Sequence, residues 1–259
     1  MQIKGTVAIV TGGASGIGEA TVRLLVSKGA KVIIGDINYE LGKKFETELN
    51  KNGNVAKFVI CDVRNPINIQ NLFEAAKHEF GPAQIMFNNA GIYEREEDID
   101  SIDRITNLVH INFTAVVHGC QFAHRHFEEQ LKSDPNRQFC IINTSSYSAI
   151  MNAAFLPVYS TTKTAVRTLT HILAHMEWTN TRINAVAPSL TRTRILTDVP
   201  SDQLEAAEIV GLMTPEHIGE RVIKLIEDDT LNGEVMGIDP DGDELAPQPL
   251  IMPIMKSKI

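Results

Sequence analysis

The sequence predicts an α/β fold: a doubly wound, seven-stranded parallel sheet with helices on both faces. Short β-branched runs alternate along the chain with longer segments whose apolar residues recur at spacings of three and four, the period of a helix that packs on one side. The β-branched runs are almost continuously apolar, as parallel strands are when both faces of their sheet are covered. No linker rich in Pro, Gly or Ser interrupts the 259 residues, so we expect a single domain over 1–259.

The predicted strands follow one another along the whole chain. They are residues 7–10, 31–35, 56–61, 85–88, 139–144, 182–187 and 235–238. Amphipathic segments separate them, and the clearest are residues 19–27, 67–79 and 215–226. Each strand and the segment after it form one unit, and about seven such units fill the chain without an internal repeat.

The net charge of the chain argues against a nucleic-acid partner. It is −8, and the basic residues are scattered, whereas a phosphate backbone requires concentrated positive charge. The amino terminus lacks the pattern of a signal peptide, and no apolar window reaches the length of a membrane span. We therefore expect a cytoplasmic protein with no membrane partner. One alternative stays open, because Ser257-Lys258-Ile259 differs by one residue from the S-K-L peroxisomal signal.

The cysteines predict neither a disulfide framework nor a metal site. Cys61, Cys120 and Cys140 are odd in number, lack metal-ligand spacing and lie in apolar stretches. We expect all three to be buried as small hydrophobic residues, and we expect no bound metal.

A glycine-rich turn follows the first predicted strand. The run Thr11-Gly12-Gly13-Ala14-Ser15-Gly16-Ile17-Gly18 connects that strand to a helix. Glycines at such a turn permit unusual backbone angles, and they let a pyrophosphate approach the N–H groups at the positive end of the helix. Because glycines also form ordinary tight turns, the run by itself only suggests a dinucleotide site of the Rossmann type.

An acidic residue stands near the position that a dinucleotide site requires. Asp36 ends the second strand, 18 residues beyond Gly18. A carboxylate there accepts hydrogen bonds from the adenosine ribose hydroxyls and repels a 2′-phosphate, and no basic residue immediately follows Asp36. The pattern favours NAD over NADP, and its alternative is a solvated acid at the end of a strand.

A tyrosine and a lysine lie four residues apart, at Tyr159 and Lys163. On a helix this spacing places both side chains on one face. A free phenol has a pKa of about 10 and is a poor base at neutral pH, but a neighbouring ammonium favours the phenolate and lowers that pKa. The pair suits removal of a proton from an alcohol while a hydride leaves the same carbon. The same spacing also occurs in helices that have no chemical role.

Taken together, these motifs resemble the short-chain dehydrogenase/reductase family. The resemblance spans nearly the whole chain and rests on seven features in the family's order: Thr11-Gly12-x-x-x-Gly16-x-Gly18, Asp62, Asn88-Asn89-Ala90-Gly91, Asn112, Ser146, Tyr159-x-x-x-Lys163, and Pro188 with Thr193. It implies a dehydrogenase with a cofactor half at about 1–145 and a catalytic, substrate-binding half at about 146–259. Where many relatives have Pro-Gly, this chain has Pro188-Ser189.

The resemblance also implies catalytic roles. Tyr159 is the general base or acid, and Lys163 holds the nicotinamide ribose beside it. Ser146, 13 residues before Tyr159, hydrogen-bonds the substrate oxygen, although the adjacent Ser145 offers a second hydroxyl. Asn112 lies where the central helix bends and holds a water that links Lys163 to solvent; its alternative is a polar residue on a helix surface.

Contacts with NAD are implied at the glycine turn, after the second, third, fourth and sixth strands, and at the catalytic pair. These residues are Gly12, Ser15, Gly16, Ile17, Gly18, Asp36, Ile37, Asp62, Val63, Asn89, Ala90, Gly91, Tyr159, Lys163, Pro188, Thr191 and Thr193.

Within the family, residues 141–146 and 225–233 are most similar to the 15-hydroxyprostaglandin dehydrogenase group. These are structural segments and carry lineage rather than substrate. Leu156 is apolar where a polar residue is expected in that group, and the segment between Thr193 and Pro215 looks shorter.

We expect the substrate to be a hydrophobic secondary alcohol or ketone, such as a hydroxy fatty acid, terpenoid or steroid. The residues expected beside the reacting carbon are mostly apolar: Tyr147, Ser148, Met151, Leu156, Leu190, Ile195 and Leu196. Arg192 and Arg194 could contact a substrate carboxylate or simply be solvated. The working direction could be ketone reduction, and a non-catalytic dinucleotide-binding protein is the alternative from another functional class.

We also expect a homodimer or homotetramer. The run 247–253 is apolar and requires a neighbour, and family members commonly pair through the helices that contain Asn112 and Tyr159.

Overall fold

An eight-stranded sheet forms the centre of the computed structural model, which describes residues 1–151, 153–194, 196 and 211–249. Its spatial order is β3-β2-β1-β4-β5-β6-β7-β8. The strands are β1 (Val7–Thr11), β2 (Lys31–Asp36), β3 (Ala56–Ile60), β4 (Ile85–Asn88), β5 (Phe139–Thr144), β6 (Thr181–Pro188), β7 (Val235–Asp239) and β8 (Gly242–Leu245). β1 to β7 pair in parallel, so the predicted parallel sheet and its seven strands are confirmed.

β8 adds an antiparallel edge to the seven predicted strands. It pairs with β7 through a tight turn, in which Asp239 lies opposite Gly242. All four residues of β8 are exposed and it contains two acids. The strand therefore lacks the apolar pattern that predicted the others.

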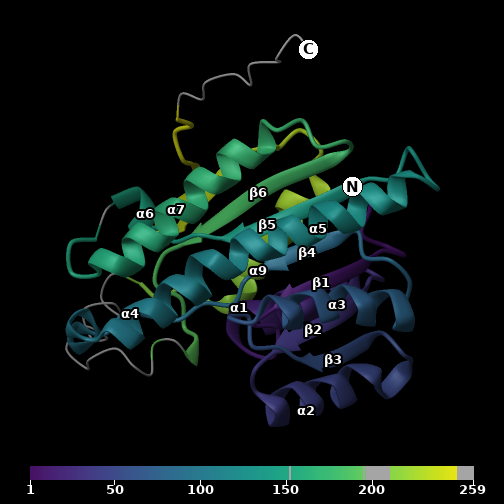
Figure 1. The fold of residues 1–259 in the computed structure, drawn as a ribbon, viewed down its shortest axis with the longest axis horizontal. Helices are drawn as coiled ribbons and strands as arrows, with labels where there is room; N and C mark the ends of the chain where they lie inside the picture. Colours follow the sequence, from purple (N-terminus) through teal and green to yellow (C-terminus); the bar gives the residue numbers. More distant parts are fainter. Residues whose placement is uncertain (152, 195, 197–210, 250–259) are drawn as a thin grey trace.

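Helices cover both faces of the sheet (Figure 1). They are α1 (Gly16–Ser27), α2 (Tyr39–Leu49), α3 (Pro66–Glu79), α4 (Ile102–Val109), α5 (Ala115–Leu131), α6 (Ser148–Met151), α7 (Pro157–Ala174) and α9 (Pro215–Glu227). The N-cap side chains Asn38, Asn65, Ser101 and Thr214 accept backbone N–H groups at the starts of α2, α3, α4 and α9. The N-cap residues of α1 and α7, Ser15 and Leu156, make no such bond.

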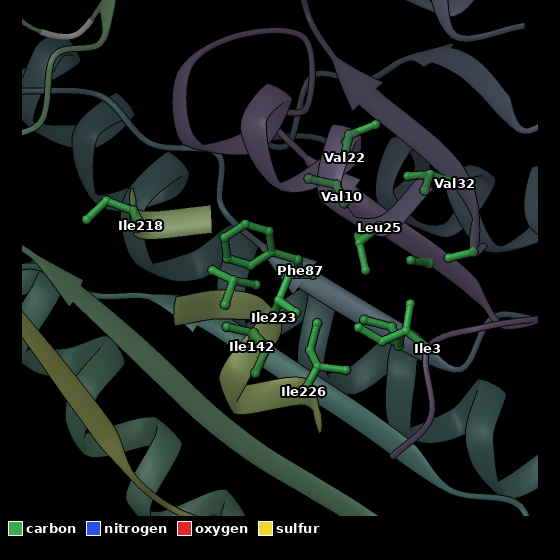
Figure 2. Packing of buried hydrophobic residues seen from close by; sticks show 14 of the residues in the cluster. Ile3, Val10, Val22, Leu25, Val32, Phe87, Ile142, Ile218, Ile223 and Ile226 are labelled. Atoms are coloured by element: carbon green, nitrogen blue, oxygen red, sulfur yellow. The ribbon is translucent and has the colours of Figure 1, made fainter. Parts of the chain in front are cut away.

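The alternation of side chains along each strand supplies two hydrophobic cores. Val10 and Val32 point to the layer of α1 and α9, where Figure 2 shows them with Val22 and Ile223. Ile9 and Ile33 point to the opposite layer, which contains α3 and α5. Helices therefore pack on both faces of the sheet, and the ends of the strands are left for the loops that form a site.

The winding of the chain reverses between β1 and β4. β2 and β3 lie on one side of β1, whereas β4 to β7 lie on the other side. At such a switch point the loops that leave two neighbouring strands run in opposite directions and open a crevice beyond the carboxyl ends of the strands. The predicted glycine turn follows β1 at this place.

A buried chain of polar side chains ties the middle of the sheet to the helices above it. The Asn88 amide on β4 donates to Asn143 Oδ1 on β5 at 2.9 Å, and the Asn143 amide donates to Thr170 Oγ1 on α7 at 3.0 Å. Cys120 on α5 lies within 3.6 Å of both amides. Because these side chains bond to one another across β4, β5, α5 and α7, they help to fix where α5 and α7 cross the sheet.

The central helix changes its hydrogen-bonding pattern part-way along. A π-helical segment, η3 (His110–Thr114), joins α4 to α5. Its wider turn contains Asn112 and interrupts the ordinary helical ladder where the sequence predicted a bend.

Several expectations concern residues beyond the cofactor and catalytic sites. Cys61, Cys120 and Cys140 are buried free thiols, as predicted. Within the described ranges, no helix combines the length and the apolar character needed to cross a membrane. Ile195, most of the segment between Thr193 and Pro215, the last part of the run 247–253 and Ser257-Lys258-Ile259 lie outside the described residues.

The contact between α5 and β4 gives a test of the fold. A Cβ at Gly119 would lie 1.9 Å from Asn88 Oδ1, and the Asn88 side chain cannot retreat without breaking the bond from its Nδ2 to Asn143 Oδ1. We expect Gly119→Ala to lower the free energy of unfolding by about 1–3 kcal/mol, despite the better helix propensity of alanine. Urea denaturation measures this. The exposed Gln121→Ala on the same helix should change stability by less than about 0.5 kcal/mol; equal stability of the two variants would contradict the packing.

Candidate active site

The glycine turn after β1 forms a close-fitting cradle. Gly12 and Gly16 have φ angles of +61° and +54°, which side chains rarely adopt. A Cβ at Gly12 would lie 2.9 Å from Ala90 Cα, and one at Gly18 would lie 2.1 Å from Gly12 O. The first helical bond of α1 runs from Glu19 N–H to Ser15 O at 3.1 Å, so the amides of Gly16 to Gly18 precede the helical ladder. These features fit an anionic diphosphate at the start of α1.

Asp36 lies beside this turn. Its two carboxylate oxygens accept N–H groups from Ala14 at 3.0 Å and from Asn38 at 2.9 Å. The carboxylate is therefore held at the mouth of the crevice, with lone pairs left for a ribose hydroxyl. Ile37, the next residue, exposes 63% of its surface and offers an apolar contact.

Asp62 follows β3 and is engaged by a residue that the sequence interpretation overlooked. Arg64 donates to both carboxylate oxygens at 2.6 and 2.9 Å and also reaches Asn107 Oδ1 on α4 at 3.0 Å. Its guanidinium holds the pKa of Asp62 below the usual range. An adenine at Asp62 would share that carboxylate with Arg64. The i, i+2 spacing of the two charges was the available signal.

Asn89 and Ala90, which follow β4, are hydrogen-bonded to the glycine turn. Thr11 Oγ1 accepts the N–H groups of Asn89 at 3.0 Å and Ala90 at 3.2 Å, and the Asn89 amide donates to Thr11 O and Gly12 O. Thr144 Oγ1, at the end of β5, lies 3.4 Å from Asn89 Oδ1. The ends of β1, β4 and β5 are thereby joined.

The segment after β6 returns to the same turn. A Cβ at Gly16 would lie 3.0 Å from Thr193 Cγ2, so Thr193 faces the start of α1. Thr191 is buried and pairs with Met213, while Pro188 O accepts the Tyr147 N–H at 2.9 Å. Thr193 is thus placed at the glycine turn, and Pro188 and Thr191 lie in the segment that leads to it.

The structure separates the two neighbouring serines. Ser145 Oγ donates to the Lys163 carbonyl at 2.9 Å and is almost fully buried. Ser146 lies close enough to the Tyr159 phenol for its hydroxyl to lower the pKa of that phenol, and the Ser146 Oγ lies 3.0 Å from Ser148 Oγ. The geometry thus puts the Ser146 hydroxyl at the phenol and the Ser145 hydroxyl in the packing of α7.

Tyr159 and Lys163 share one face of α7, as their spacing predicted. The Lys163 ammonium lies 5.7 Å from the centre of the Tyr159 ring and donates to Thr144 O at 2.9 Å. This bond joins α7 to the end of β5. Lys163 is 3% exposed, and its burial lowers its pKa to about 8.

One electrostatic expectation is wrong for the structure as it stands. From the spacing of the two residues, Lys163 is expected to lower the pKa of Tyr159. Instead, burial of the phenol raises that pKa; the hydrogen bond with Ser146 opposes the increase, and the Tyr93 phenol adds to it. The physical reason is that burial disfavours the charged phenolate, while the Lys163 ammonium donates its hydrogen bond to the Thr144 carbonyl.

Asn112 is fully buried, which contradicts the alternative of a polar residue on a helix surface. Its side-chain amide donates to Ile92 O and accepts from Ile92 N, both at 2.9 Å. A Cβ at Gly91 would lie 3.3 Å from Asn112 Oδ1 and 3.4 Å from Lys163 Nζ. The glycine therefore lets the asparagine and the lysine approach the same point.

Substrate-side expectations are met unevenly. Met151 and Leu190 are exposed, at 68% and 38%, and so is Phe155, at 71%, which was not among the expected residues. Tyr147 is directed toward β8, since its hydroxyl donates to Glu244 at 3.1 Å. Leu156 and Leu196 are buried and pack rather than face an open cleft.

A hollow of about 680 Å³ lies elsewhere. It is lined by Phe113, Ala153, Ala154, Pro157, Ser160, Thr161, Thr164, Ala165, Thr168, Leu169 and Ile172. On α7 these residues lie opposite Tyr159 and Lys163. The hollow is therefore not the space beside the phenol.

Two further residues at Tyr159 were not predicted. Tyr93 places its ring 5.8 Å from that of Tyr159, and Glu94 Oε2 accepts the Tyr159 backbone N–H at 2.6 Å. No periodicity or spacing in the sequence signals these contacts, which join Tyr159 to residues 66 and 65 positions before it.

Comparison with known proteins places these features in context. The pattern of the family described as short chain dehydrogenase matches residues 6–204. The chain is 30% identical over 255 residues to 15-hydroxyprostaglandin dehydrogenase (NAD+) of Rattus norvegicus, which covers 92% of each chain. It is 32% identical over 253 residues to 3beta-hydroxysteroid dehydrogenase 2 of Eggerthella lenta, covering 92% of this chain and 94% of the other.

Among solved structures, the fold is similar to 3-ketoacyl-(acyl-carrier-protein) reductase from Brucella melitensis complexed with NADH. The TM-score is 0.79 at 25% identity, over 92% of this chain and 98% of the other.

The buried lysine predicts a pH-dependent stability. Because its folded pKa of about 8 lies below the ordinary 10.5, the unfolded chain holds more protons between these values, and stability rises with pH across that window. Lys163→Met removes the effect. Its stability relative to the unmutated chain should therefore fall by about 2 kcal/mol between pH 7 and pH 9.5, measured by urea denaturation. Substitution of an exposed lysine, Lys132→Met, is the control. If the difference in unfolding free energy between Lys163→Met and the unmutated chain were constant with pH, the burial of a charged ammonium would be contradicted.

Proposed function

Because the chain belongs to the short-chain dehydrogenase family, we propose that it is an NAD-dependent oxidoreductase that moves a hydride between a hydrophobic secondary alcohol and NAD. The predicted resemblance to this family, and within it to the 15-hydroxyprostaglandin dehydrogenase group, is confirmed. The observation that carries the proposal is the meeting of Ser146, Tyr159 and Lys163 beside a glycine turn that fits a diphosphate.

The crevice at the glycine turn suits NAD. The amides at the start of α1 would receive the diphosphate, and Asp36 would accept the adenosine ribose hydroxyls. A 2′-phosphate there would meet the Asp36 carboxylate and be repelled. Support also comes from the NAD+ in the name of the rat relative and the NADH bound to the Brucella enzyme.

The chain's own residues supply the proton chemistry. Ser146 would hold the substrate oxygen, and Tyr159 would take the hydroxyl proton as the carbon–hydrogen bond breaks and a ketone forms. NAD, when bound, supplies the hydride acceptor and a positive ring charge beside the phenol. Lys163 would hold the nicotinamide ribose, and Asn112 would keep the neighbouring backbone in place.

The substrate class follows from the exposed apolar groups around this site. Ile92 follows the carboxyl end of β4 and exposes 37% of its surface, and Leu190 follows that of β6 and exposes 38%. Met151 and Phe155, also exposed, precede the start of α7. Such side chains favour an apolar alcohol over a sugar. The same residues would serve ketone reduction in the reverse direction, since each step is reversible.

Removal of the Tyr159 hydroxyl tests the proposal. NADH formation should be measured with hydroxysteroids, hydroxy fatty acids and terpenoid alcohols. We expect Tyr159→Phe to lower turnover by about 10²–10⁴-fold, because the proton acceptor is lost, while NADH binding measured by fluorescence persists. If NADH binds but no alcohol or ketone reacts in the unmutated chain, a non-catalytic dinucleotide-binding protein becomes the better account.

The same panel run with NADP tests the cofactor assignment. Turnover should prefer NAD, and Asp36→Ser should reduce that preference by removing the repulsive charge. A preference for NADP in the unmutated chain would show that the assignment to Asp36 is wrong.

We also propose that the chain forms a homodimer or homotetramer through the face of α7 opposite Tyr159. There Ile172 exposes 47% of its surface, and the nearby Met176 exposes 45%. Sedimentation should give a multiple of the 28.6 kDa chain mass, and Ala165→Arg in the hollow should release smaller species. A mass of one chain for the unmutated protein would overturn this proposal.

A further inference from the structure

The three residues that follow Gly91 contact the two helical segments that carry the candidate catalytic groups. Ile92 holds the Asn112 amide through both its N–H and its carbonyl. Tyr93 places its ring against that of Tyr159, and Glu94 accepts the Tyr159 backbone N–H. The segment thus connects η3 to the first turn of α7.

Glu94 is an unusual member of this segment because it is a buried acid. It is 3% exposed, which makes it one of the few carboxylates removed from water among the described residues. A buried carboxylate is costly unless it is hydrogen-bonded. Its bond to the Tyr159 N–H, at 2.6 Å, is short and charge-assisted.

The start of α7 explains what that bond supplies. The N-cap residue Leu156 has no side-chain acceptor, and Pro157 has no N–H. The first helical bond runs from Ser160 N–H to Leu156 O at 2.9 Å, so the Tyr159 N–H precedes the helical ladder. A carboxylate from a loop 65 residues away takes the place of a local cap, at the end of the helix that favours negative charge.

We propose that Glu94 is a positioning residue for Tyr159: its carboxylate fixes the first turn of α7 and so holds the phenol against Ser146. This inference rests on the proposed function of Tyr159. Glu94 acts through the backbone and takes no part in proton transfer. Its value is geometric, because a displacement of about 1 Å at a reacting group can cost 10²-fold in rate.

Two substitutions separate the hydrogen bond from the charge. Glu94→Gln keeps an oxygen that accepts the Tyr159 N–H, whereas Glu94→Leu removes the acceptor at similar size. We expect Glu94→Leu to lower kcat by about 10²-fold, with KM for NAD changed by less than about threefold because the glycine turn and Asp36 are untouched. Glu94→Gln should restore kcat to within about fivefold of the unmutated chain.

Asp98 offers a matched control. It is also a buried carboxylate and lies four residues further along. It accepts the Arg95 backbone N–H at 2.9 Å and the Arg104 guanidinium at 2.6 Å, and among the described residues its hydrogen bonds do not reach Tyr159. Asp98→Leu should therefore leave kcat nearly unchanged even if it destabilises the fold. Equal losses of kcat in Glu94→Leu and Asp98→Leu, or a Glu94→Gln variant as impaired as Glu94→Leu, would overturn the proposal.

Hydrogen exchange makes the test independent of turnover. Because the Tyr159 N–H is held by Glu94, its exchange should be slow in the unmutated chain and in Glu94→Gln, and at least about tenfold faster in Glu94→Leu. Unchanged exchange in Glu94→Leu would overturn the positioning. If the unmutated chain turns over no substrate while exchange responds as expected, the proposed function fails and the contact of Glu94 with Tyr159 stands.

Discussion

The site depends on one constraint, which is that the strands that carry it run parallel to one another. Because β1, β4, β5 and β6 run in one direction, their carboxyl ends meet at one edge, and the loops that leave them converge there. The bond from Lys163 Nζ to Thr144 O then fixes α7 to the end of β5. Positions distant in sequence, from Gly12 to Thr193, become neighbours through this arrangement.

The site concentrates buried charge at the start of α7. The Lys163 ammonium lies 5.7 Å from the centre of the Tyr159 ring, and the Glu94 carboxylate accepts the Tyr159 backbone N–H. Each of the two charged groups has a hydrogen-bond partner that offsets part of the cost of leaving water. The lowered pKa of the lysine shows that the offset is incomplete. We interpret this residual cost as stability exchanged for a rigid arrangement around Tyr159.

Much of this architecture is readable in the sequence. The parallel strands were predicted because burial on both faces makes them continuously apolar, and the spacing of Tyr159 and Lys163 gave their common face. The exposed, acidic β8 has no such pattern. The separation of Ser145 from Ser146 depends on how α7 packs, and the contacts of Arg64 and Glu94 are made by single side chains, which leave no periodic signal.

The crystal structure of the chain with NADH would test the central claim most directly. The account predicts the adenosine ribose hydroxyls within about 3 Å of the Asp36 carboxylate, with the nicotinamide ribose at Tyr159 and Lys163. The phenol should then face open space beside Ser146 that admits a substrate oxygen. A nicotinamide bound away from Tyr159, or a ribose that does not touch Asp36, would contradict the account.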